Sequence, residues 1–381
     1  MRTCCTFIFG LLAVILGGLL SGEFSRLGVI RYVVEDIISD PALYGMCPAF
    51  VDQTVPHWDY SSIKPGELNG KVALVTGGNS GLGFSTAMQL ALKGATTVLG
   101  CRSEEKCRVA SDKINAAVKL TDSIGEAIPM TVDMSSFDSV KSFTRAFSRR
   151  FQTLNIFVQN AGIISGPELK LTDDGIERTF QTNHFGHFQM SQCLKPLLEK
   201  ASETGLVRIV VVSSAAHYAP PKDFTMWTSL EEINNLENFR KYFYYSMTKF
   251  ANVLFANGIA GGMLLENSEN IIATSLHPGA VETGIWEADV SREIFESYNM
   301  PTWLRDDVII PTLRSIRNQT MWTIYEGAWT QTYLATQAKK AESGKYFHPI
   351  IRQLEVHPMA NDAKNIKAFW ELSSKVTAGK C

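Results

Sequence analysis

The chain has 381 residues, of which 45% are hydrophobic and 19% are charged, and its formal net charge is −2 at pH 7. A chain of this length can bury a full core, as one large domain or two small ones. The near balance of charge gives no global sign of nucleic acid or an anionic surface as a partner. The seven cysteines are scattered, without a CxxC or Cys/His cluster, which predicts no structural metal and argues against a disulfide scaffold.

The N-terminal residues 3–22, TCCTFIFGLLAVILGGLLSG, carry no charge. As a helix this run would be about 30 Å long, enough to cross a bilayer. An arginine precedes it, as in a signal peptide, but the run is long for a signal and SGE at its end is a poor cleavage site. We therefore expect a membrane anchor over 1–22, in the endoplasmic reticulum or another endomembrane, whereas a cleaved signal would make the protein secreted. Arginines also follow the run, so its orientation stays open.

The segment 23–67 is expected to connect this anchor to the main domain, because prolines interrupt regular structure there. From Lys71 onwards, short apolar runs alternate with stretches long enough for helices. This alternation predicts an α/β fold, a doubly wound parallel sheet whose ligands bind at the carboxyl ends of the strands. The expected strands are 72–76, 96–100, 129–133, 155–159, 208–212 and 271–276.

A glycine turn follows the first expected strand and opens a helix, in VALVTGGNSGLGFSTAMQLALKG. Gly77 allows the tight turn, Gly81 lets the backbone approach a pyrophosphate, and Gly83 lets the helix pack closely on the sheet. The helix N-terminus offers free N–H groups to the anion, so the loop predicts nucleotide binding. The residues expected to bind the nucleotide here are Gly77, Asn79, Ser80, Gly81, Leu82 and Gly83.

The spacing of this loop, Thr-Gly-x-x-x-Gly-x-Gly, resembles that of the short-chain dehydrogenase/reductase family, whose Rossmann-type domain the chain resembles over residues 68–377. The resemblance implies further cofactor contacts in chain order. Asp133 with Met134 resembles the position beside the adenine, and NAG resembles the motif after the fourth strand. HPGAVETG resembles the segment that clamps the nicotinamide end. These implied contacts are Asp133, Met134, Asn160, Ala161, Gly162, Pro278, Gly279 and Thr283.

Cofactor choice is indicated at the end of the second strand, in VLGCRSEEK. An NAD enzyme needs an acid there for the ribose 2′-hydroxyl, but this chain has Cys101 followed by Arg102. A guanidinium suits a 2′-phosphate, so NADP(H) is expected rather than NAD(H). The ordinary alternative for Arg102 is a solvated side chain at the start of a helix.

The stretch FYYSMTK places Tyr245 four residues before Lys249, on one face of a helix. A phenol titrates near pH ~10, and a nearby ammonium lowers that value, so the pair is predicted to exchange protons with an alcohol or carbonyl oxygen. Ser214 ends a strand, where a hydroxyl can hold the reacting oxygen. Alone, each has a structural explanation, as a surface contact or a turn residue.

The family resemblance gives these residues their roles. It implies that Ser214 binds substrate, that Asn183 holds a water of a proton relay, and that Tyr245 and Lys249 also contact the cofactor, the lysine at the ribose. Asn183 could otherwise be a buried helix amide. The implied catalytic set is Asn183, Ser214, Tyr245 and Lys249.

Four stretches, TNHFGHF, YSMTKFANVLF, EGAWTQTYLAT and SGKYF, resemble the branch that holds retinol dehydrogenases and WW-domain-oxidoreductase-like proteins. This branch and the anchor together imply a lipophilic substrate such as a retinoid, a sterol or a polyisoprenoid. The inserted segment 218–241 is expected to border the substrate cleft, and 284–325 lies where family members have a lid. Its aromatic residues, which line an apolar pocket or belong to the core, are Trp286, Phe295, Tyr298, Trp303 and Trp322.

Two alternatives stay open at this point. Protochlorophyllide reductase shares the tyrosine–lysine pair and reduces a ring double bond, although its characteristic cysteines are not evident here. The domain could also be a catalytically idle nucleotide sensor or scaffold, against which the intact catalytic set argues. Family members often pair through helices, so the resemblance also implies a homodimer.

Overall fold

The computed structural model describes residues 58–279 and 322–381, apart from 167, 221–223, 236, 238, 267–268 and 350, together with 281 and 302. The expected anchor and most of the connecting segment therefore lie outside the described residues. In the part of the chain that is described, no helix is both long and apolar enough to cross a bilayer. The chain divides into two compact units: one holds 58–278 and 324–381, and the other holds 1–57 and 279–323.

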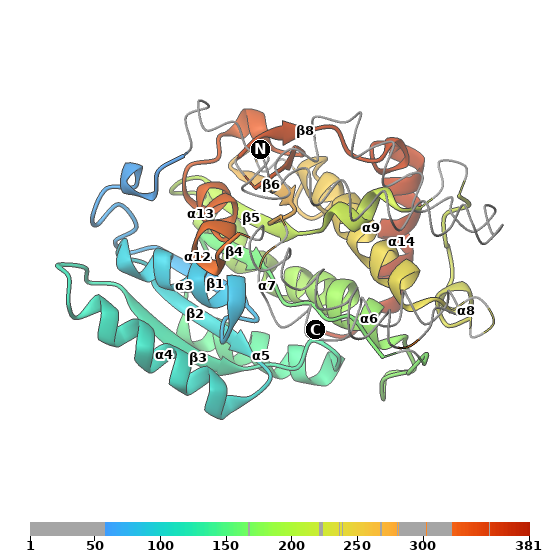
Figure 1. The fold of residues 1–381 in the computed structure, drawn as a ribbon, viewed down its shortest axis with the longest axis horizontal. Helices are drawn as coiled ribbons and strands as arrows, with labels where there is room; N and C mark the ends of the chain where they lie inside the picture. The colour runs from blue at the N-terminus through green and yellow to red at the C-terminus, as the bar shows by residue number, and fades with distance from the viewer. Residues whose placement is uncertain are drawn as a thin grey trace. The chain divides into compact units, whose positions relative to one another are not determined.

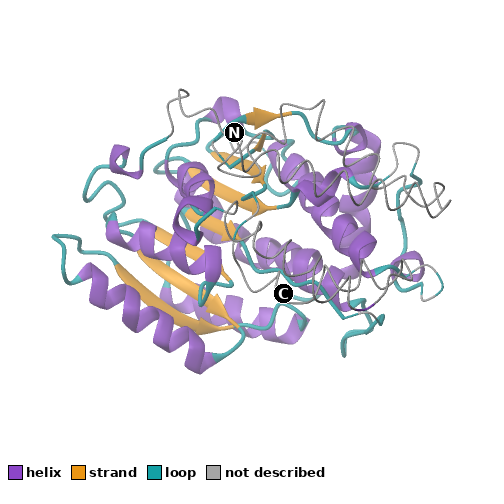
Figure 2. Ribbon diagram, in the orientation of Figure 1, coloured by secondary structure: helices purple, strands orange, loops and turns teal. Residues whose placement is uncertain are grey.

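The larger unit is built on one eight-stranded sheet, which Figures 1 and 2 show between its helices. The strand order is β3-β2-β1-β4-β5-β6-β7-β8. All neighbours are parallel except β7 and β8, which are antiparallel. The order reverses direction at β1, so the expected doubly wound α/β sheet is confirmed. The strands are β1 Val72–Thr76, β2 Thr96–Cys101, β3 Glu126–Thr131, β4 Ile156–Gln159, β5 Val207–Val212, β6 Ile271–Leu276, β7 Tyr346–Phe347 and β8 Gln353–Leu354.

The helices connect these strands and cover both faces of the sheet. The α-helices are α3 Gly81–Leu92, α4 Glu104–Val118, α5 Phe137–Arg150, α6 Arg178–Phe180, α7 Gly186–Ser202, α8 Leu230–Ile233, α9 Lys241–Ala260, α12 Ile324–Gly327, α13 Trp329–Thr336 and α14 Ala363–Val376. The shorter helices are the π-helix η5 Gln181–Phe185 and the 3-10 helices η4 Tyr60–Ser62, η6 Ala215–Tyr218, η9 Lys340–Glu342 and η10 Pro358–Ala360.

Alternate residues of the central strands point to opposite faces, as strand geometry requires. Leu74 and Val98 belong to the core that packs against α5, α7 and α9. Ala73 and Val75 belong to the core that packs against α3, α4 and α13. Both faces are apolar, so the strands are buried on both sides, which explains why they read as continuous apolar runs rather than alternating ones.

The third strand differs from the sequence expectation, because it runs over Glu126–Thr131 rather than 129–133. The expected strand was the apolar run PMTVD, which begins at Pro129. Here Pro129 pairs with Leu99 inside the strand. An edge strand tolerates proline because one side of its backbone has no strand partner.

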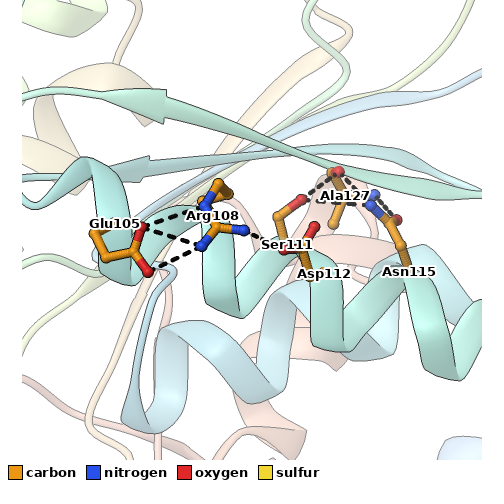
Figure 3. A network of polar contacts seen from close by, with 6 residues as sticks. All are labelled: Glu105, Arg108, Ser111, Asp112, Asn115 and Ala127. Carbon is orange, nitrogen blue, oxygen red and sulfur yellow. Dashed lines mark hydrogen bonds and ion pairs between the residues drawn. The ribbon is translucent and has the colours of Figure 1, made fainter.

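Helix α4 supplies partners for this edge strand (Figure 3). Asn115 accepts from the Ala127 N–H at 2.8 Å and donates to the Ala127 carbonyl at 3.0 Å, and Ser111 donates to the same carbonyl at 2.8 Å. On the outer side of α4, Arg108 pairs with Glu105 and Asp112. The Arg108 side chain is 56% exposed, so these ion pairs contribute about 0–1 kcal/mol and the inner contacts matter more.

The residues from Trp58 to 67, the last part of the expected connecting segment, belong to the larger unit and pack on its helices. The Trp58 indole donates to Gln337 at 2.7 Å, and the Tyr60 hydroxyl donates to the Gln89 carbonyl at 2.7 Å. Ile63 is completely buried. These contacts attach the last part of the segment 23–67 to helices α3 and α13.

All four described cysteines are paired, as Cys101–Cys107 and Cys193–Cys381. The sequence argued against a disulfide scaffold, and these two bonds depart from that expectation. Cys101 ends β2 and Cys107 lies in the first turns of α4, where the turn brings their Cα atoms to 5.7 Å. Cys193 and Cys381 are 188 residues apart, so only the tertiary fold reveals their proximity.

Candidate active site

The candidate site lies at the carboxyl ends of the parallel strands β1 to β6. Because parallel strands end at the same edge of a sheet, residues that directly follow them gather there although they are distant in sequence. The predicted residues at or just after these ends are Gly77, Arg102, Asp133, Asn160, Ser214 and Pro278.

The glycine loop has the backbone that a nucleotide phosphate requires. Gly77 and Gly81 have φ of 67° and 54°, which residues with a side chain rarely adopt. A Cβ on Gly83 would lie 2.4 Å from the Gly77 carbonyl oxygen, so only glycine allows this packing. Ser80 precedes α3 without capping it through its side chain, which leaves the first N–H groups of the helix available to an anion. The residues present therefore fit a nucleotide, with Asn79 and Leu82 in the same turn.

Thr76 fixes this loop against the NAG turn after β4. Its hydroxyl oxygen accepts from the N–H groups of Asn160 and Ala161 at 3.0 Å each, and the Asn160 amide donates to the Thr76 carbonyl at 2.9 Å. The Asn160 side-chain oxygen accepts from Gln331 on α13 at 3.4 Å. Thr76 was visible in the sequence as the first residue of the Thr-Gly loop, but only the structure shows that it joins this loop to the NAG turn.

Arg102 and Asp133, the two residues expected near the adenosine end of the cofactor, differ in their surroundings. Arg102 is exposed directly after β2, and the preceding Cys101 is buried in its disulfide bond. The Asp133 carboxylate accepts from the backbone and hydroxyl of Ser135 at 2.9 and 2.6 Å, which fixes its orientation after β3. Met134 is buried, and a Cβ on Gly186 would meet its carbonyl oxygen at 2.4 Å.

Tyr245 and Lys249 lie one turn apart on α9, beside the end of β5. The Lys249 Nζ is 5.6 Å from the centroid of the Tyr245 ring and donates to the Val212 carbonyl at 3.1 Å. Asn252 donates to the same carbonyl at 3.1 Å, one further turn along α9. Ser214 follows two residues after Val212, and its hydroxyl is near enough to the Tyr245 phenol to oppose the rise of the phenol's pKa. The structure thus brings together the phenol, the hydroxyl and the amine.

The pKa values differ from the sequence expectation. Burial raises the pKa of Tyr245 to about 12, and the nearby Ser214 hydroxyl only partly opposes this. Burial also lowers the pKa of Lys249 to about 8. Sequence reasoning expected the ammonium to lower the pKa of the phenol, but desolvation dominates both groups, because Lys249 is buried and Tyr245 is partly buried. The Tyr245 phenol is therefore protonated at neutral pH in the protein alone.

Asn183 lies on the π-helix η5, in which the Gly186 N–H reaches back five residues to the Gln181 carbonyl. The Asn183 side chain accepts from the Ile163 N–H at 2.8 Å and donates to the Ile163 carbonyl at 2.9 Å and the Thr248 hydroxyl at 3.0 Å. A Cβ on Gly162 would lie 3.4 Å from both Asn183 Oδ1 and Lys249 Nζ. Gly162 thus lets these two side chains approach the same point.

Most of the remaining predicted site residues, those after β6, lie outside the described part of the chain. Gly279 has a φ of 85°, the left-handed conformation that favours glycine after Pro278. Trp322 is buried and forms an isolated parallel bridge with Val281. The predictions that fall outside the described residues are Thr283, Trp286, Phe295, Tyr298 and Trp303.

Comparison with known proteins adds independent observations. Residues 71–229 match a family model described as short chain dehydrogenase. The chain is 31% identical to human retinol dehydrogenase 14 over 324 residues, which cover 81% of this chain and 87% of that protein. It is 31% identical to WW domain-containing oxidoreductase of Gallus gallus over 318 residues, covering 81% and 69%, and 32% identical to human dehydrogenase/reductase SDR family member 13 over 312 residues, covering 82% and 74%.

Solved structures share the fold at lower identity. A protein from Mycobacterium paratuberculosis matches with a TM-score of 0.60 at 24% identity, covering 84% of this chain and 98% of that one. A short chain dehydrogenase from Shigella flexneri, complexed with NADP, matches with a TM-score of 0.54 at 18% identity, covering 75% and 99%.

Proposed function

Because the chain belongs to the short-chain dehydrogenase/reductase family, in its retinol dehydrogenase and WW-domain-oxidoreductase-like branch, we propose that it is an NADP(H)-dependent enzyme that interconverts an alcohol and a carbonyl on a lipophilic substrate. Membership makes it an oxidoreductase that uses a nicotinamide cofactor. The preference for NADP(H) and the lipophilic substrate are the proposal. The observation that carries the chemistry is the Tyr245 phenol, one helical turn from Lys249, whose Nζ lies 5.6 Å from the centroid of the phenol ring, and near the Ser214 hydroxyl.

In this proposal each site residue has its own role in proton transfer and in binding the reacting oxygen. The cofactor, when bound, supplies or accepts the hydride through nicotinamide C4. Tyr245 donates a proton to the carbonyl oxygen in reduction and takes it back in oxidation. Ser214 holds the same oxygen through its hydroxyl. Lys249, charged below about pH 8, stabilises the negative charge that develops on the phenol as its proton leaves.

Two observations support NADP(H). The last residue of β2 is not an acid that could bind a ribose 2′-hydroxyl but Cys101, which is buried in a disulfide bond. Arg102 follows it and is exposed, free to meet a 2′-phosphate with charge-assisted hydrogen bonds. Gly77, Gly81 and Gly83 would bind the pyrophosphate at the start of α3.

Arg102→Ala tests this cofactor assignment. The substitution should raise the KM for NADPH by about tenfold, because a charge-assisted hydrogen bond to the 2′-phosphate is worth about 1.5–3 kcal/mol, and should leave the KM for NADH nearly unchanged. The matched control is Arg108→Ala, which removes an exposed arginine from the same helix region without approaching the strand end. An unaltered preference for NADPH in Arg102→Ala would remove Arg102 from the cofactor site.

The branch relatives support the substrate class, since one of them is a retinol dehydrogenase. The uncharged run 3–22 supports it too, because a membrane anchor would hold the site where lipophilic alcohols and aldehydes concentrate. In this proposal, residues 1–22 anchor the chain in an endomembrane and residues 68–377 form the catalytic domain.

A substrate panel tests the proposal as a whole. Purified full-length protein is given NADPH or NADH with retinal, a sterol ketone, a polyisoprenoid aldehyde or a short water-soluble aldehyde, and cofactor oxidation is followed by absorbance. We expect kcat/KM to be highest for a lipophilic carbonyl with NADPH. Equal turnover of the water-soluble aldehyde would contradict the substrate class, and no turnover of any carbonyl would contradict the reaction.

A further inference from the structure

One buried imidazole touches both the nucleotide loop and the segment that carries Asn183. His187 lies in the first turn of α7 and is 2% exposed. Its Nε2 is 2.8 Å from the Thr76 hydroxyl oxygen, and its Nδ1 is 3.2 Å from the Asn183 backbone oxygen. Thr76 fixes the NAG turn, and Asn183 belongs to the π-helix η5. His187 is therefore in direct contact with two parts of the site that are 107 residues apart in the chain, from position 76 to position 183.

The hydrogen bonds of Thr76 determine which nitrogen of His187 carries the proton. The Thr76 hydroxyl accepts from the N–H groups of Asn160 and Ala161, which uses both of its lone pairs. Its own proton must then be donated, and the nearer acceptor is His187 Nε2 at 2.8 Å rather than the Val158 carbonyl at 3.5 Å. Nε2 is thus unprotonated.

The contact of His187 Nδ1 leads independently to the same tautomer. A backbone carbonyl oxygen only accepts hydrogen bonds, so the contact with Asn183 requires a proton on Nδ1 of His187. A neutral imidazole has one donor and one acceptor nitrogen, which is what the two neighbours demand. Both hydrogen bonds of the His187 ring therefore form only when the ring is neutral and carries its proton on Nδ1.

The surroundings keep the ring neutral. Burial lowers the pKa of His187 to about 3, and the positive charge of Lys249 adds to this effect, while the Asn183 carbonyl opposes it. The imidazolium form would place a second donor against the Thr76 hydroxyl, whose lone pairs are already used. His187 does not act as an acid or base in this arrangement.

We propose that His187 is a positioning residue, a neutral imidazole protonated on Nδ1 that sets the Thr76–NAG turn against the π-helix bearing Asn183. The ring fixes the distance between the segment that would hold the cofactor and the segment that would relay protons. This kinetic consequence rests on the proposed function, whereas the tautomer does not.

His184, three residues earlier, provides a matched control. It is equally buried, at 1% exposure, but its Nε2 contacts the Ser373 hydroxyl of α14 at 2.8 Å. Its ring lies 4.9 Å from that of Phe369, also on α14. The His184 side chain thus joins η5 to the C-terminal helix.

Nitrogen NMR of the full-length wild-type chain with isotope-labelled histidines tests the tautomer directly. The His187 signal, identified by its loss in His187→Gln, should show a protonated Nδ1 and an unprotonated Nε2. It should not titrate across about pH 6–8, where an ordinary histidine does. A proton on Nε2, or titration in that range, would overturn the proposal without any activity measurement.

Kinetics test the positioning role. His187→Phe leaves the Thr76 hydroxyl without its acceptor, so the Kd for NADP(H) should rise and kcat should fall, each by about tenfold. His187→Gln offers one acceptor and one donor and should recover most of the loss. His184→Gln should lower the unfolding temperature yet keep kcat per folded molecule within about twofold, because the His184 side chain packs on α14, whereas His187 holds the Thr76 hydroxyl.

The outcomes separate this proposal from the function proposed above. If His187→Phe, like His184→Gln, loses only stability, His187 is an ordinary core histidine and the positioning role fails. If the tautomer is as stated and His187→Phe weakens NADP(H) binding, but no carbonyl is turned over by wild type, the positioning role stands and the proposed reaction fails.

Discussion

At the scale of single residues, burial dominates the chemistry of the site. Tyr245 has a pKa raised to about 12, and Lys249 has a pKa lowered to about 8, both chiefly through desolvation. Sequence spacing places the two side chains on one helix face, and the structure agrees with that placement. Their burial could not be predicted, because it depends on the packing of β5, β6, η6 and α14 around α9. This is why the expected direction of the Tyr245 pKa was wrong.

These values predict the pH dependence of carbonyl reduction. Tyr245 stays protonated well beyond pH 8, so the acid needed for reduction is present throughout. Lys249 loses its charge above about pH 8, and with it the stabilisation of the forming phenolate. We expect kcat/KM for reduction to fall above about pH 8. Lys249→Met has no proton to lose there, so its lower activity should stay flat over the same range.

Folding stability should rise with pH over the range in which kcat/KM for reduction falls. The pKa of Lys249 is lower in the folded chain, about 8, than the 10.5 of the free side chain. The unfolded chain therefore binds more protons between these values, and folding stability rises with pH across that window. Below about pH 8 the buried charge costs stability, so Lys249→Met should unfold at a higher temperature than wild type at neutral pH. A lower unfolding temperature for Lys249→Met would show that burying the Lys249 ammonium does not destabilise the folded chain.

At the scale of elements, the sequence predicted most strands and the glycine loop but not the connections between elements. Five of the six expected strands lie within one residue of their predicted bounds, because buried parallel strands are short apolar runs. β7 and β8 have two residues each and no such signal. The π-helix η5 was equally hidden, since its shift from α-helical hydrogen bonding has no composition of its own.

Helix α13 shows what the sequence could not reveal. Gln331, which is completely buried, accepts from the Thr86 hydroxyl of α3 at 3.0 Å and donates to Asn160 at 3.4 Å. A helix more than 200 residues downstream thus contacts both the phosphate helix and the NAG turn. The stretch EGAWTQTYLAT marked the branch in the sequence, but nothing in it indicated this contact.

Gln331→Leu should therefore weaken cofactor binding. The substitution leaves Thr86 and the Asn160 oxygen without this partner, so the KM for NADPH should rise by about tenfold, with a smaller change in kcat. Thr332→Val is the control on the same helix, because Thr332 donates only to Gln89 at 2.8 Å and is also completely buried. Both variants should lose about 1 kcal/mol of stability. If Thr332→Val raised the KM for NADPH equally, the effect would come from helix packing and not from Gln331.

At the scale of the whole molecule, the sequence and the comparisons agree on the family and the parallel sheet. The disulfide between Cys193 and Cys381 was beyond prediction, because it joins residues 188 positions apart. The N-terminal run 3–22 stays a prediction, since it lies outside the described residues.

Carbonate extraction of membranes tests the anchor. The full-length chain should remain in the membrane pellet, because an uncharged run of this length stays in the bilayer when peripheral proteins are released. A chain without residues 1–22 should move largely to the supernatant. Release of the full-length chain would rule out a spanning anchor, and retention of the shortened chain would place the membrane contact elsewhere.

The central claim is that the Tyr245 hydroxyl transfers the proton, and turnover of the best carbonyl from the panel by Tyr245→Phe tests it most directly. Removing one oxygen atom from this position should lower kcat by roughly a hundredfold or more while NADPH binding persists. Tyr244→Phe is the matched control: its hydroxyl donates to the Asn235 carbonyl at 3.0 Å, away from Ser214, and its kcat should stay close to wild type. Turnover by Tyr245→Phe equal to that of wild type would contradict the account.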